Sequence, residues 1–232
     1  MKRSLLVLAI TTLASSLLAA DSKEEVTTAA KKLGEKANYS WKTTIVVPES
    51  AQFKPGPTEG KAEKDGFAHV KMTNPNFTME VVIKGEKRAF TNQDGEWRTP
   101  EEAEGDQGQG RFAAGFVRNL RVPAAHAAEI AAGTKELKKD GDVIAGDMTE
   151  DAAKNLMRFR RGGGDGPTIS DAKGSAKFWV KDGILSKYEF KVSGKMNFNN
   201  NDIDVDRTTT VEIKDVGTSK IEVPEGAKKK LS

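Results

Sequence analysis

The stretch from Ser175 to Val223 constrains the fold more than any other part of the chain, because its side chains alternate between apolar and charged. A period of two with aromatic and β-branched residues predicts strands that have one buried and one solvated face. Asp182-Gly183 lies between two such runs and favours the positive φ angles of a tight hairpin. The apolar set comprises Phe178, Val180, Tyr188, Phe190 and Val192. This part of the chain is therefore predicted to form an antiparallel sheet with one face to be covered.

The N-terminal third shows the same alternation. Strands are predicted over 39–47, 60–73, 77–84 and 87–92. Asp94-Gly95 is a second hairpin signal and leads to Trp97. The side chains expected on the inner face are Trp41, Ile45, Met79, Val81 and Ile83 here, and Phe178, Val180, Tyr188 and Phe190 in the C-terminal part.

Helical patterns surround and separate these strands. Helices are predicted over 22–36, 111–121 and 123–132, with a fourth after the capping residue Thr149. An acidic linker is expected over 101–110, a short strand over 143–145, a loop over 160–172 and a solvated lysine tail at 228–230. Strands that flank a central helical insertion predict an α+β class with a largely antiparallel sheet. We expect one domain over 21–232, with the insertion at about 108–133.

The first twenty residues have the features of a secretory signal peptide. Lys2 and Arg3 precede an apolar stretch that is too short to span a bilayer securely, and small residues end at Ala20. Cleavage there would leave a mature chain without a transmembrane span, in the periplasm or secreted. The alternative is an uncleaved N-terminal anchor. The chain has no cysteine, which excludes disulfides, thiolate metal sites and lipid-modified cysteine.

Charge and motifs exclude several function classes. The full chain carries a formal charge of +3, and basic residues cluster only around Arg158, Arg160 and Arg161, so nucleic acid is not an expected partner. His69 and His126 lack partners at ligand spacing, and Asp202, Asp204 and Asp206 lack a calcium-loop pattern. No nucleophile, base and orienting group can be assembled, so we expect no enzyme, no metal and no cofactor.

Phe112, Phe116 and Leu120 form an apolar stripe on the predicted helix over 111–121. The stripe has two interpretations. The helix can pack on the sheet as ordinary core, or it can line a cavity for a hydrophobic ligand. The two differ only in whether space remains between helix and sheet.

The order of these features resembles the outer-membrane lipoprotein carrier superfamily, and within it the branch of lipid-carrying mycobacterial lipoproteins. The resemblance covers most of the mature chain. The matching segments are Asp94-Gly95-Glu96-Trp97, Gly146-Asp147-Met148-Thr149, Phe178-Trp179-Val180-Lys181-Asp182-Gly183, Thr210-Val211-Glu212-Ile213, Asp215-Val216-Gly217 and Ile221-Glu222-Val223-Pro224.

The resemblance implies an open, curved antiparallel half-barrel with helices over its concave face. It implies a non-enzymatic protein that holds acyl chains of lipids or lipoproteins between the two layers, without a cofactor. The ligand-binding residues would then be the nine inner-face residues named above, together with Phe112, Phe116 and Leu120. The chain lacks the lipid-modified cysteine of the mycobacterial branch, so its anchoring does not carry over. The same scaffold also serves as a structural or sensor module without a ligand cavity.

Overall fold

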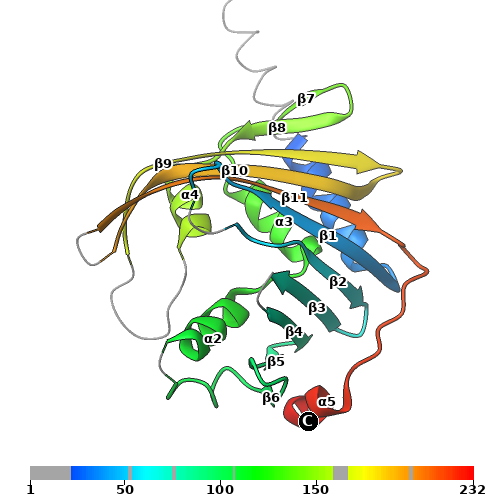
Figure 1. Ribbon diagram of the computed structural model, residues 1–232. Coiled ribbons are helices and arrows are strands. Elements are labelled where there is room, and N and C mark those ends of the chain that lie inside the picture. Colours follow the sequence, from blue (N-terminus) through cyan, green and yellow to red (C-terminus); the bar gives the residue numbers. More distant parts are fainter. Residues whose placement is uncertain (1–21, 52–53, 75–76, 107, 159–166, 199–200) are drawn as a thin grey trace, which may run out of the picture.

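The computed structural model in Figure 1 describes residues 22–51, 54–74, 77–106, 108–158, 167–198 and 201–232. The strands are β1 (Asn38–Val46), β2 (Thr58–Glu63), β3 (Phe67–Asn74), β4 (Phe77–Lys84), β5 (Lys87–Thr91), β6 (Trp97–Arg98), β7 (Lys138–Asp140), β8 (Val143–Asp147), β9 (Thr168–Lys181), β10 (Ile184–Phe198) and β11 (Asn201–Lys214). The helices are an N-terminal one over residues 22–34, α2 (Gln109–Asn119), α3 (Pro123–Ala132), α4 (Glu150–Met157) and α5 (Glu225–Leu231).

All eleven strands belong to one antiparallel sheet, in the order β6-β5-β4-β3-β2-β1-β11-β10-β9-β8-β7. Each half of the chain forms a meander, and the halves join where β1 pairs with β11. The sheet is curved and open, because β6 and β7 lie at opposite edges (Figure 1). The helices α2 and α3 lie between β6 and β7 in the sequence. This arrangement confirms the predicted α+β class and the open antiparallel sheet.

The predicted hairpin at Asp182-Gly183 forms as expected. Asp182 and Gly183 have φ angles of 52° and 71°, and they join Lys181 to Ile184. Two positive φ angles in a two-residue loop match the right-handed twist of the strands on either side. Other boundaries differ from the prediction. The strand expected over 60–73 is two strands, because Gly66 has a φ of 89° and turns the chain between β2 and β3.

Two segments at the C-terminal side are more ordered than predicted. The loop expected over 160–172 lies partly outside the described residues, but β9 already begins at Thr168, since Thr168 pairs with Asn197 of β10. In the solvated tail expected at 228–230, Lys228 and Lys229 are exposed, but the segment is not irregular. It forms α5, because Ala227 and Leu231 recur at helical spacing and are buried against Val82 and Ala89.

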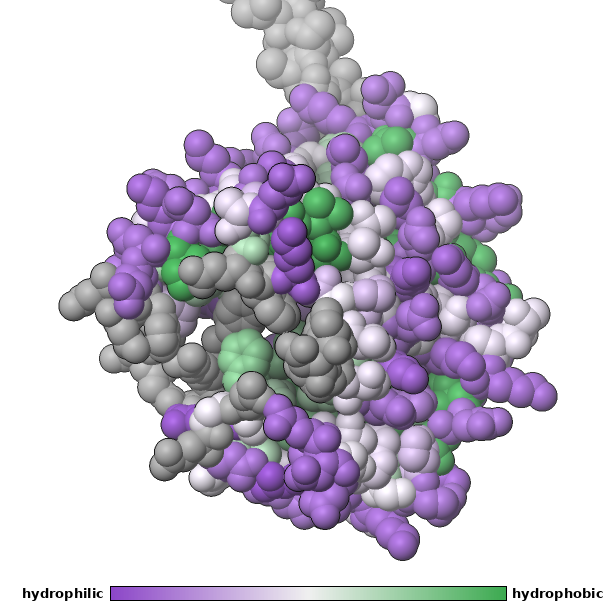
Figure 2. All heavy atoms as spheres, viewed as in Figure 1, coloured by the Kyte–Doolittle hydropathy of each residue, from purple (hydrophilic) through white to green (hydrophobic). Residues whose placement is uncertain are grey.

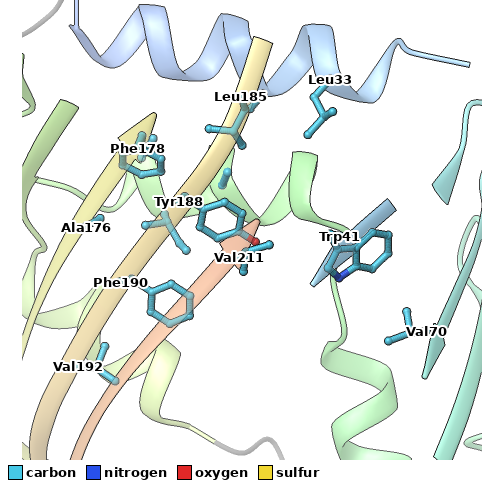
Figure 3. Close-up of a cluster of buried hydrophobic side chains, with 14 of the residues drawn as sticks. Leu33, Trp41, Val70, Ala176, Phe178, Leu185, Tyr188, Phe190, Val192 and Val211 are labelled. Atoms are coloured by element: carbon cyan, nitrogen blue, oxygen red, sulfur yellow. The ribbon is translucent and has the colours of Figure 1, made fainter. Parts of the chain in front are cut away.

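The main core lies on the concave face, under the N-terminal helix, α2, α3 and α4. Figure 3 shows Phe178, Tyr188 and Phe190 following β9 and β10 toward Trp41 of β1. Trp41 lies flat against its cross-strand partner Gly60, where a Cβ atom would come within 2.2 Å of the indole. A separate, smaller apolar cluster lies on the convex face under α5. Residues from both halves of the chain therefore share the main core.

The start of α4 provides a local test of the fold. Thr149 is the N-cap, and its hydroxyl oxygen accepts a hydrogen bond of 3.2 Å from the Ala152 amide. Replacing Thr149 with alanine should lower the free energy of unfolding by about 1 kcal/mol. Chemical denaturation measures this loss, and Thr149→Ser should retain nearly all of the stability. Equal losses in both variants would contradict the capping role.

Candidate functional site: the concave face of the sheet

The concave face is tightly packed at the end covered by the N-terminal helix and α3. Phe178, Leu185 and Tyr188 are at most 1% exposed there, and Leu33 of the N-terminal helix is fully buried. The rings of Phe178 and Tyr188 are stacked with centroids 6.5 Å apart. We call this region the covered end. The side chains of the covered end named above are packed within the main core.

A polar contact holds α3 to the sheet at the covered end. His126 of α3 lies with its Nδ1 2.9 Å from the Tyr188 hydroxyl, at hydrogen-bonding distance. Its ring also meets the edge of Phe190, with centroids 5.4 Å apart. Burial, aided by the positive charge of Arg121, lowers the pKa of His126 to about 4. The imidazole is therefore neutral at pH 7.

The first turn of α3 is held by a second tyrosine. Burial raises the pKa of Tyr39 to about 12, and a hydrogen bond with the backbone of Ala124 opposes that rise. Ala124 stands in the first turn of α3, where the N-cap residue Val122 makes no side-chain hydrogen bond. Amides in a first turn have no partner within their helix, so Tyr39 supplies one from the sheet.

The opposite end of the concave face is less completely covered. Strand register places the end of β1, the end of β3 and the first half of β11 together at this end. Apolar side chains here keep part of their surface accessible, and Ile203 of β11 is 51% exposed. We call the following set the rim. The rim comprises Ile45, Met72, Ile203 and Val205 of the strands, and we include Phe116 and Leu120 of α2, which pack on the same core and stay half-buried.

The rim contrasts with its surroundings. Figure 2 shows a mainly hydrophilic face in which apolar residues stand between charged ones. Arg207 of β11 lies next to the rim and donates from Nη2 to the Leu156 carbonyl of α4. Burial lowers the pKa of this guanidinium. Val205 and Arg207 alternate with Asp204 and Asp206 along β11, and this period of two indicates that Val205 and Arg207 lie on the inner face. Neither Val205 nor Arg207 was among the predicted site residues.

The predicted ligand-binding residues divide between the two regions and the core around them. Trp41, Met79, Val81, Ile83, Phe178, Tyr188 and Phe190 are buried, Ile45, Phe116, Leu120 and Val180 are half-buried, and Phe112 is 48% exposed. The predicted helix stripe is not the most buried face of α2, which is formed by Ala114 and Val117. Leu120 caps α2 at its C-terminus. Whether these residues contact a ligand stays a prediction.

Two shallow surface hollows are bordered by described residues. One lies beside β8 and β9 and is lined by residues such as Lys135, Gly146 and Lys177. The other lies between the N-terminal helix and the β9–β10 hairpin, near Thr28, Lys139 and Val180. Neither separates α2 or α3 from the sheet. The second hollow borders the covered end, where Phe178, Leu185 and Tyr188 are nevertheless buried like ordinary core.

The candidate groups for other chemistry are engaged elsewhere. His69 pairs with Glu80 at 2.8 Å. Among the contacts of the described residues, no serine joins this pair as a nucleophile would. Asp202 and Asp206 contact Asn197 and Lys191. Within the described ranges no three histidine or carboxylate side chains are grouped so that they could hold a metal ion. No helix in that part of the chain is long and apolar enough to cross a membrane.

Solved structures with a similar outline come from two Mycobacterium species and from Nitrosomonas europaea. LprF from Mycobacterium bovis is 10% identical, with 90% of this chain and 98% of that chain covered, at a TM-score of 0.45. The Mycobacterium tuberculosis lipoprotein LppX is 7% identical, with coverages of 88% and 99% and a TM-score of 0.45. A LolA superfamily protein from Nitrosomonas europaea is 11% identical, with coverages of 88% and 95% and a TM-score of 0.32.

No family model matches the sequence, and no curated protein matches it either. Of these structures, LppX is described as a lipoprotein and the Nitrosomonas protein as a LolA superfamily member. At identities of 7–11% the likeness is one of general outline, so the function rests on the residues of this chain.

Proposed function

We propose that this protein holds an apolar chain, such as the acyl chain of a lipid or lipoprotein, at the rim of its concave face. The observation that supports this most is the graded exposure of that face. Side chains such as Phe178 and Leu185 are fully buried at the covered end, whereas at the rim Ile45 and Val205 are half-buried and Ile203 is 51% exposed. Apolar surface left accessible in a concave position gains free energy when an apolar ligand covers it.

The proposal includes no chemical step. The rim is built from aliphatic, thioether and aromatic side chains, and such groups bind through shape and burial. Each square ångström of apolar surface removed from water contributes about 25 cal/mol. Acyl chains of lipids have the length and apolarity to follow a curved sheet. We further propose that residues 1–20 direct export, so that this binding takes place in the periplasm or outside the cell.

A ligand-free structural or sensor module is the second candidate. It is favoured by the covered end, where His126 fills the space between α3 and the sheet by contacting Tyr188 and Phe190. In this case the rim would be the partly exposed edge of a packed core and would bind no ligand. The two candidates differ in whether the purified protein takes up a fatty acid.

Binding of a fluorescent fatty acid separates the candidates, with Phe116→Ala as the test variant. Phe116 packs on the core but stays half-buried, so the change should weaken binding clearly and lower the free energy of unfolding by less than the 3–5 kcal/mol of a fully buried phenylalanine. The matched control is Val46→Ala, which removes an apolar side chain that is 62% exposed on β1.

Fluorescence titration of the wild type and both variants gives the fatty-acid affinity, and chemical denaturation gives the free energy of unfolding. Native mass spectrometry and solvent extraction of protein purified from its own envelope would then show the bound molecule. Negligible fatty-acid uptake by wild type and Phe116→Ala alike would reject the carrier proposal and leave the structural module.

A further inference from the structure

Strand β5 is enclosed by two helices, one on each face of the sheet. Phe90 of β5 belongs to the concave core, and α2 packs on this strand. Its neighbour Ala89 points to the convex face and is buried under α5. Helices α5 and α2 therefore lie on opposite faces of the same strand, β5.

The docking of α5 is close and specific. Ala227 and Leu231 are buried in the convex cluster, and the Lys87 ammonium donates to the Leu231 carbonyl at 3.3 Å. At Gly226 a Cβ atom would come within 2.4 Å of the Trp97 ring, so only glycine allows this approach. With seven residues, α5 is too short to be stable as an isolated helix. Its order therefore depends on this contact.

A chain of ion pairs links α5 to α2 around the edge of the sheet. Lys230 of α5 lies 2.6 Å from Glu102 in the segment 99–106, which connects β6 to α2. From the other side, Arg118 of α2 contacts Glu104 at 2.6 Å and donates to the Pro100 carbonyl at 3.0 Å. The connecting segment is held between the two helices.

Arg98 of β6 fixes the middle of that segment. Its guanidinium contacts Asp106 at 2.6 Å and donates to the Glu102 carbonyl at 2.5 Å. The Thr99 amide donates to the Glu102 carboxylate at 2.9 Å. Glu102 is therefore oriented from its own segment before Lys230 meets it, which reduces the entropy lost when the pair forms.

We propose that α5 is a latch that controls access to the rim by fixing the position of α2. When α5 is docked, β5 and the segment 99–106 are held from behind, and α2 keeps Phe116 against the core. When α5 is released, α2 loses this support and the rim opens. The role in ligand access rests on the proposed function, whereas the coupling of α5 to α2 does not.

Hydrogen exchange of the full-length protein tests the coupling without any ligand. Gly226→Ala should drive α5 from Trp97, although alanine favours an isolated helix, so any loosening comes from the collision. The α2 amides should then exchange about tenfold faster or more, while those of β9 and β10 stay unchanged. Lys230→Ala should accelerate α2 by about two- to fivefold, as expected for one exposed ion pair.

Lys229→Ala is the matched control, since Lys229 is an exposed lysine on the same helix. It should leave α2 exchange at the wild-type rate. Faster exchange of α5 alone, with α2 unchanged in Gly226→Ala and Lys230→Ala, would overturn the latch. So would a uniform acceleration of all strands in both variants, since that would indicate global destabilisation.

A separate experiment tests whether α5 controls the access of a ligand to the rim. In the variants, fatty-acid dissociation measured by stopped-flow fluorescence should accelerate by a factor similar to that of α2 exchange. An unchanged dissociation rate with accelerated α2 exchange would overturn the control of access. A wild type that binds no fatty acid would reject the carrier proposal, while the exchange data would still decide the coupling.

Discussion

Replacement of Phe178 by alanine is expected to lower the free energy of unfolding by about 3–5 kcal/mol. Phe178 is fully buried, and its ring stacks on Tyr188 at the covered end of the concave face. The neighbouring strands and the covering helices restrict relaxation, so the change leaves a cavity. Urea denaturation of both proteins measures the difference.

Phe112→Ala removes the same atoms at a position that is 48% exposed. It should cost clearly less, because about half of that side chain is already in contact with water in the folded state. Similar losses at positions 112 and 178 would contradict the tight packing of Phe178 at the covered end.

Acidification should destabilise the protein through His126. Its pKa is about 4 in the folded state and near 6.5 when exposed, so below pH 6.5 the unfolded chain binds more protons than the folded one. The contribution of neutral His126 to the free energy of unfolding is fully present above pH 6.5. It decreases as the pH falls below 6.5 and is lost as the pH falls through 4. The contribution reaches up to about 3 kcal/mol. A protonated ring would also face the Arg121 charge.

His126→Asn isolates this contribution, because asparagine keeps a polar atom near the position of Nδ1 but does not titrate. Denaturation curves between pH 7 and pH 4 should show a flatter pH dependence for the variant than for the wild type. Parallel curves for the two proteins would show that the imidazole does not resist protonation in the folded state.

Much of the sheet could be predicted from the sequence, because period-two alternation is a local signal. Asp182-Gly183 and the strands around it form where expected. The tail was mispredicted since Ala227 and Leu231 become a helix only by docking on Val82 and Ala89, which is a tertiary effect.

The site was harder to predict for a related reason. Phe112, Phe116 and Leu120 stand in one helical row, yet the buried face of α2 is set by its contact with β5 and falls on Ala114 and Val117. Likewise, His126 has no neighbour in the sequence that announces Tyr188, which is 62 positions away. Local periodicity contains no information on such pairs.

The pairing of β1 with β11 has a consequence for how the chain folds. Ser40 donates to the carboxylate of Asp215 across a sequence separation of 175 residues, and among the described strands the two meanders pair with each other where β1 meets β11. Contacts of such high contact order form slowly, since the intervening chain must first be brought together. During synthesis the first meander is complete long before β11 emerges, so that β1 is paired with β2 on one edge only. Completion of the sheet and of the shared core therefore has to wait until β11 has been made.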